Sequence, residues 1–185
     1  PLAELLGAAE GGRLVYHYAD AVRLAGHSCP TVAGAWLMTA RALALLYPGS
    51  VPVRGNLRVQ MREAASVANA GVVGAVIGLI TGAAGEAGFQ GLGGRMARRG
   101  LLEFGIAMTG DARFVRCDIG VAVELVYRPQ SVPPEAALQA LMPAVVGGMA
   151  GRAEAGEFAR RWQDRVRRLL LETPADTVVE ATGAA

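Results

Sequence analysis

The feature that most constrains this fold is the stretch from residue 64 to residue 85, which contains no charged side chain. As a helix, this stretch would be long enough to cross a bilayer. It also contains five glycines and only seven large aliphatic residues, so transfer into lipid would gain little free energy. Gly74, Gly78 and Gly82 recur every four residues, which leaves one face of a helix bare for another backbone. We therefore expect a glycine- and alanine-rich helix buried inside the protein, and no membrane insertion.

The rest of the chain alternates between helical and strand periodicity. Of its 185 residues, 52% are apolar and 18% are charged, which is the balance of one packed domain. We expect a single domain over residues 1–185, with its core in 13–172 and a flexible tail in 173–185. The expected helices are 15–24, 30–46, 133–146 and one around 158–169; the expected strands are 56–61, 101–108 and 113–127, the last two forming a hairpin through a turn at 109–111. This order predicts an α+β fold with an antiparallel-rich sheet packed against helices.

The charged residues exclude several kinds of chemistry. All 18 basic residues are arginine, so there is no lysine for a Schiff base, a P-loop or a general base. The net charge of +2 is small, and no basic patch is interleaved with aromatic residues, so we expect no nucleic-acid partner. Arg95, Arg98 and Arg99 follow a glycine-rich loop at 88–94. This loop either cradles an anion or simply carries solvated arginines.

Cys29 and Cys117 are the only cysteines, which is too few for a disulfide framework. Reduced thiols and the lack of a signal-peptide pattern at residues 1–6 favour a cytoplasmic location. Cys117 alternates with Val115 and Ile119, the pattern of a small core residue on a strand. Arg116 and Asp118 are expected to face the other way and to pair.

The residues best suited to chemistry are His27 and Cys29, which precede Pro30. Proline is well tolerated at the first helical position, so Cys29 is expected at the N-cap, where free amides and the helix dipole stabilise a thiolate. Imidazole nitrogen and thiolate sulfur together suit Zn²⁺ or a neighbouring metal. His17 is the candidate third ligand if the chain bends back onto the site. Judged from these residues alone, the spacing of His27 and Cys29 favours a buried structural cysteine beside a hydrogen-bonded histidine over a metal site.

The run Gly26-His27-Ser28-Cys29-Pro30, followed by an alanine-rich helix, resembles the FmdE family, which takes its name from formylmethanofuran dehydrogenase. The order of features over residues 17–128 is also similar, including a small-residue helix that ends in Thr81-Gly82. The resemblance implies an α+β core, a homodimer and a metal-associated pocket to which His27, Cys29 and Thr81 carry over. This chain differs from the family in having Ala25 where a second histidine is common, and in having no C-x-x-C pair. It therefore resembles a divergent core domain.

Three functions follow as hypotheses. The first is a transition-metal protein, with zinc as the expected metal, that uses His27, Cys29 and His17 in a catalytic or metal-carrier role, with Thr81 near the cofactor. The second is a thiol enzyme or redox sensor in which Cys29 is the nucleophile and His27 its base. The third is a small-molecule or cofactor binder whose cleft is built by the glycine stripe together with Tyr16, Trp36 and Phe89.

Overall fold

The computed structural model describes residues 1–184 and places most of them around one five-stranded sheet. The strands are β1 (Leu57–Met61), β2 (Leu102–Phe104), β3 (Ala112–Arg116), β4 (Ala122–Tyr127) and β5 (Val179–Ala184). Their spatial order is β2-β1-β3-β4-β5, in which only the β1–β2 pair is parallel. The α+β class and the antiparallel-rich sheet are therefore confirmed.

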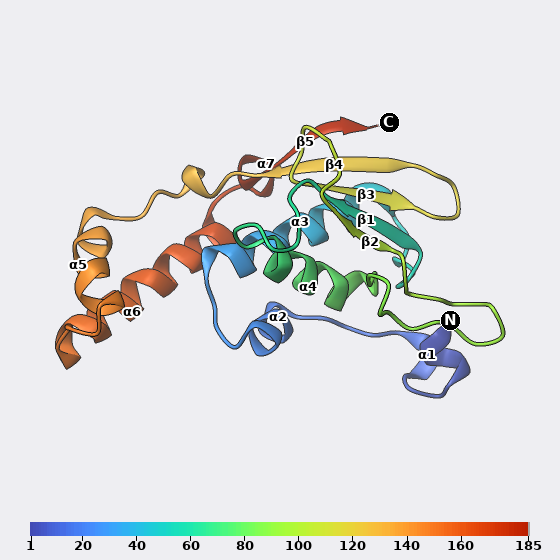
Figure 1. The fold of residues 1–185 in the computed structure, drawn as a ribbon, viewed down its shortest axis with the longest axis horizontal. Coiled ribbons are helices and arrows are strands. Elements are labelled where there is room, and N and C mark those ends of the chain that lie inside the picture. Colours follow the sequence, from blue (N-terminus) through green and yellow to red (C-terminus); the bar gives the residue numbers. More distant parts are fainter. Residues whose placement is uncertain (185) are drawn as a thin grey trace.

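Helices α3 (Pro30–Leu46) and α4 (Ala70–Thr81) lie together along one face of this sheet (Figure 1). The strands alternate accordingly: Leu57, Val59 and Met61 on β1 are buried, whereas Arg58 between them is exposed. Phe114 is completely buried between the sheet and the helices. The main core therefore lies between the sheet and the α3–α4 layer, as the two periodicities require.

The remaining helices surround this layer. Helix α2 (Tyr18–Ala25) packs on α3 and α4, and α6 (Arg152–Arg167) runs from α3 towards α5 (Ala136–Val146). Short elements complete the chain: α1 (Leu2–Leu5), η1 (Glu10–Gly12), η2 (Pro129–Ser131), the π turn η3 (Arg168–Glu172) and α7 (Ala175–Val178). A second buried cluster joins α2, α3 and α4, and it includes Ala21, Cys29 and Val76.

The charge-free stretch contains the expected buried helix, but α4 occupies only residues 70–81 of it. Its glycines contact other parts of the same chain. A side chain at Gly74 would meet the Phe104 ring at 2.5 Å, and one at Gly78 would meet the Ala83 carbonyl oxygen at 2.7 Å. Within residues 1–184, no helix has both the length and the hydropathy that spanning a membrane requires.

The hairpin was predicted at the wrong place. Residues 102–104 form a strand that pairs in parallel with β1, and the hairpin consists of β3 and β4. Its turn lies at residues 117–121, where Gly120 adopts a φ of 74° that suits glycine. The alternation of Val115, Cys117 and Ile119 concealed this turn, and Cys117 is exposed in it, so the core position predicted for Cys117 is wrong.

The C-terminal segment also differs from the expectation, which placed the core in residues 13–172 and a flexible tail after it. Val178 and Val179 are buried, and β5 pairs with β4 along the edge of the sheet. Only six residues of this segment form the strand, and they follow a short helix. The segment is polar enough to resemble a tail in isolation, and its order comes from pairing with an otherwise open strand edge.

Candidate functional site

Cys29 is the N-cap of α3, as predicted. Its backbone is extended, its Sγ accepts a hydrogen bond from the Val32 amide at 3.5 Å, and Pro30 is the first helical residue. The residue is 9% exposed. Helix α6 fixes the preceding residue, because Trp162 Nε1 and Gln163 Nε2 both donate to the Ser28 carbonyl oxygen, at 3.1 and 3.0 Å. The cysteine is therefore held by two helices at the edge of a buried cluster.

His27 lies on the short connection between α2 and α3, and its ring is exposed. Its Nδ1 lies 2.9 Å from the Ala25 carbonyl oxygen. Because a carbonyl oxygen can only accept, Nδ1 carries the proton of the neutral ring in this contact, and Nε2 keeps its lone pair. A backbone hydrogen bond of this kind is the usual arrangement behind a metal-binding histidine.

Both residues line one cleft of about 450 Å³, together with Pro30, Thr31, Tyr127, Pro129, Trp162 and Arg165. Tyr127 forms one wall, and its hydroxyl donates to the Pro30 carbonyl oxygen at 2.7 Å. Burial raises the pKa of Tyr127 well above its usual value, so this hydroxyl stays neutral. The cleft is therefore lined by the sulfur of Cys29, the imidazole of His27 and the ring of Tyr127, which its hydrogen bond to Pro30 holds in place.

Arg165 is the only charged residue in this lining apart from the titratable His27 and Cys29. Its Nε donates to the Val132 carbonyl oxygen at 2.8 Å, and its Nη2 donates to that of Pro129 at 3.1 Å. It makes no ion pair with any carboxylate in residues 1–184. The guanidinium is thus held by neutral backbone carbonyls, and no carboxylate in the described residues neutralises its charge.

The structure does not bring His17 to this site. His17 is the N-cap of α2, where its amide donates a hydrogen bond to the Asp20 carboxylate at 2.8 Å, while His27 lies beyond the other end of α2. The helix is continuous from residue 18 to 25, so the bend that His17 needed is absent. Across the part of the chain that is described, no three His, Cys, Asp or Glu side chains cluster as metal ligands would.

Thr81 is buried at the C-terminal end of α4 and does not line the cleft. Its hydroxyl donates to the Ile77 carbonyl oxygen at 2.8 Å and accepts from the Ala83 amide at 3.2 Å. Both hydrogen-bonding roles of the hydroxyl are therefore used within the turn that ends the helix. This arrangement gives Thr81 a structural function in closing α4.

The aromatic residues expected to build a cleft are dispersed. Trp36 packs edge-on against Tyr18 with ring centroids 6.2 Å apart, Tyr16 lies under Arg54, and Phe89 is exposed. Tyr127, Trp162 and Arg165, which do line the cleft, are distant from Cys29 in sequence. Trp162 was recognisable only as one position on the apolar face of the last helix, and nothing local distinguished the other two.

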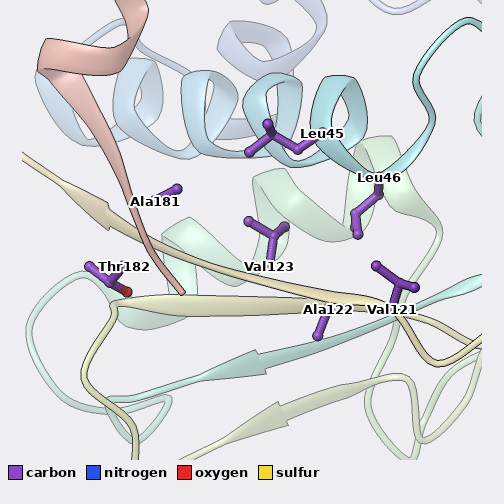
Figure 2. Close-up of a pocket in the computed structure, with 7 residues that line it drawn as sticks. All are labelled: Leu45, Leu46, Val121, Ala122, Val123, Ala181 and Thr182. Carbon is purple, nitrogen blue, oxygen red and sulfur yellow. The ribbon is translucent and has the colours of Figure 1, made fainter. Parts of the chain in front are cut away.

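A second depression of about 350 Å³ lies between the end of α3 and the strands β4 and β5 (Figure 2). Its lining consists of Leu45, Leu46, Val121, Ala122, Val123, Ala181 and Thr182. None of these side chains is titratable, and the Thr182 hydroxyl is directed at the Glu124 carbonyl oxygen. This groove offers apolar contact and no chemistry, so the cleft at Cys29 is the better candidate site.

Comparison with known proteins adds no assignment, because neither the models of protein families nor the curated proteins yield a match to this chain.

Proposed function

We propose that the protein binds a transition metal ion, most suitably zinc, through Cys29 Sγ and His27 Nε2. The observation that carries the proposal is the hydrogen bond from His27 Nδ1 to the Ala25 carbonyl oxygen, which leaves Nε2 unprotonated beside a cleft that Cys29 also lines. Nitrogen and sulfur donors of this kind suit Zn²⁺. A divergent FmdE-like core is consistent with the same two residues.

The remaining coordination positions fall to ligands from outside this chain. Zinc usually takes four ligands, and two protein ligands leave room for water or a small molecule. Arg165 lines the same cleft with a charge that no carboxylate in the described residues neutralises, so it favours anionic ligands at these positions. Open positions suit catalysis or metal transfer more than a closed structural site. We also propose a homodimer, on the strength of the FmdE resemblance alone.

The test is the metal-to-protein ratio in matched variants purified without a metal-affinity tag. The unmodified chain should hold about one metal ion. Cys29→Ser should lose it and keep its fold, because serine is a good N-cap residue. His27→Ala should lose most of the metal, because the substitution removes the imidazole ligand. His17→Ala and Cys117→Ser are the controls and should retain the metal, since both residues lie away from the cleft.

Retention of metal by Cys29→Ser would refute this proposal and favour the hypothesis that Cys29 is a thiol nucleophile. The two functions are separated further by alkylation with iodoacetamide in the Cys117→Ser background, where Cys29 is the only thiol. Added zinc should slow the alkylation of Cys29 if the metal binds there. Alkylation at an unchanged rate would count for the thiol-enzyme hypothesis.

A further inference from the structure

Two arginine side chains meet at the C-terminal end of α4, away from the cleft at Cys29. Arg98 Nη1 and Arg54 Nη1 lie 3.0 and 3.2 Å from the position that a side chain on Gly82 would occupy. The two nitrogens are therefore no more than about 6 Å apart, a spacing that two like charges adopt only at a cost. Neither arginine forms an ion pair within residues 1–184.

Glycines in the surrounding backbone make room for Arg98. A side chain at Gly55 would lie 1.3 Å from Arg98 Nη1, so the guanidinium fills the space of the missing side chain. The Arg98 backbone is anchored on both sides, because its amide donates to the Phe89 carbonyl oxygen at 2.7 Å and its carbonyl accepts from Ala84 at 3.0 Å. Arg99, the next residue, is exposed. The loop thus directs one particular arginine inward.

The positive charge at this point is only partly compensated. Arg54 Nε and Nη2 donate to the Leu79 carbonyl oxygen at 3.3 and 3.1 Å, where the helix end carries roughly half a negative charge. Arg98 has no such partner: its Nε and Nη1 are shielded from solvent and make no hydrogen bond. Burial and the charge of Arg54 both lower the pKa of Arg98. Buried donors without partners are rare in proteins, and a bound ion nearby is one of the arrangements that accounts for them.

We infer that Arg54 and Arg98 form a binding site for the phosphoryl group of a small molecule. Arg98 Nη2 and Arg54 Nη1 make no hydrogen bond within residues 1–184 and are not among the chain's solvent-shielded unpaired donors, so both remain available to a bound anion. Two guanidinium groups match a dianion in charge, and each offers one charged N–H donor group to the oxygens of that anion. Arg54 also lies over the Tyr16 ring, 5.8 Å from its centroid, which restricts its motion. The site shares no residue with the proposed metal site.

The experiment is a titration of the intact chain with inorganic phosphate by calorimetry, at constant ionic strength. Arg98→Gln and Arg54→Gln should each weaken phosphate binding by at least about tenfold, because each removes one positive charge and its donor group. Arg99→Gln, a change of the same kind at the exposed neighbour, should leave the affinity unchanged. Acetate should bind more weakly than phosphate, since it carries one charge.

Several results would overturn the inference. They are an absence of phosphate binding by the unmodified chain, equal losses in Arg99→Gln and Arg98→Gln, or acetate binding as tightly as phosphate. If Arg98→Gln does not fold, judged by circular dichroism, Arg54→Gln decides alone, because its amide can still donate to Leu79. Full affinity in that variant would refute the two-arginine site.

Discussion

At the scale of single residues, short-range chemistry explains what the sequence could predict. Pro30 after Cys29 fixes an N-cap, and the structure confirms it. Arg116 and Asp118 form the predicted ion pair, 2.6 Å between Nη2 and Oδ2. The Arg116 hydrogen bonds hold the pKa of the Asp118 carboxyl down to about 2, from 3.8. Both features depend on neighbours within a few positions along the chain.

The Asp118 pair predicts a pH dependence of stability. Because its pKa is lower in the folded state, its contribution is complete above the unfolded value near 3.8 and is lost as the pH falls towards 2. Asp118→Asn should therefore show a shallower fall in the free energy of unfolding between pH 4 and pH 2. Urea denaturation at several pH values measures this. Asp176→Asn is the control, at a residue without an ion pair in the described part of the chain, and its free energy of unfolding should fall with pH as steeply as that of the unmodified chain. An equally steep fall in Asp118→Asn would contradict the prediction.

At the scale of elements, contacts between distant segments decide which small residues matter. The Tyr127 ring on β4 lies directly on Gly34 of α3, and a side chain at Gly34 would meet its Cε1 at 2.4 Å. The same tyrosine forms a wall of the cleft through its bond to Pro30. Nothing in the glycine's own helix indicates this contact, because the two residues are far apart in the sequence.

Gly34→Ala should lower the free energy of unfolding by about 1–3 kcal/mol, because the added methyl group must displace a ring that is fixed at its hydroxyl. Gly156→Ala on α6 is the matched control. Its nearest new neighbour would be Arg160 Nη1 at 3.8 Å, so the higher helix propensity of alanine should raise stability by about 0.5–1 kcal/mol. Chemical denaturation of both variants measures whether the free energy of unfolding falls or rises. An unchanged value in Gly34→Ala would mean that the Tyr127 ring is free to move.

At the scale of the whole molecule, the glycine stripe of α4 is used inside the chain. Gly74 faces Phe104 and Gly78 faces the Ala83 carbonyl, so the stripe supplies no surface for a second copy. A dimer must therefore use another face. The expectation of a dimer rests on the resemblance of the segment around His27 and Cys29 to the FmdE family.

Light scattering at micromolar concentration should give a mass of twice the 19.1 kDa of one chain. Because the glycine stripe of α4 faces the inside of the chain, Val72→Ala on the exposed face of α4 should leave this mass unchanged, whereas a dimer formed through that exposed face would be weakened. A monomeric mass for the unmodified chain would remove the dimer proposal. The metal proposal would stand, since both of its protein ligands come from one chain.

The sequence by itself determined the α+β class, the bounds of α3, the N-cap at Cys29 and the burial of the glycine-bearing face of α4. These four features follow from hydrophobic periodicity, from the chemistry of helix ends and from the lack of charged residues. Each of these signals can be read within a short stretch of the chain. Only the tertiary structure decided that β2 joins β1 in parallel, that β5 completes the sheet, and that Tyr127, Trp162 and Arg165 share a cleft with Cys29 while His17 does not. Such pairings depend on contacts between segments far apart along the chain, and local pattern carries no information about which of them meet.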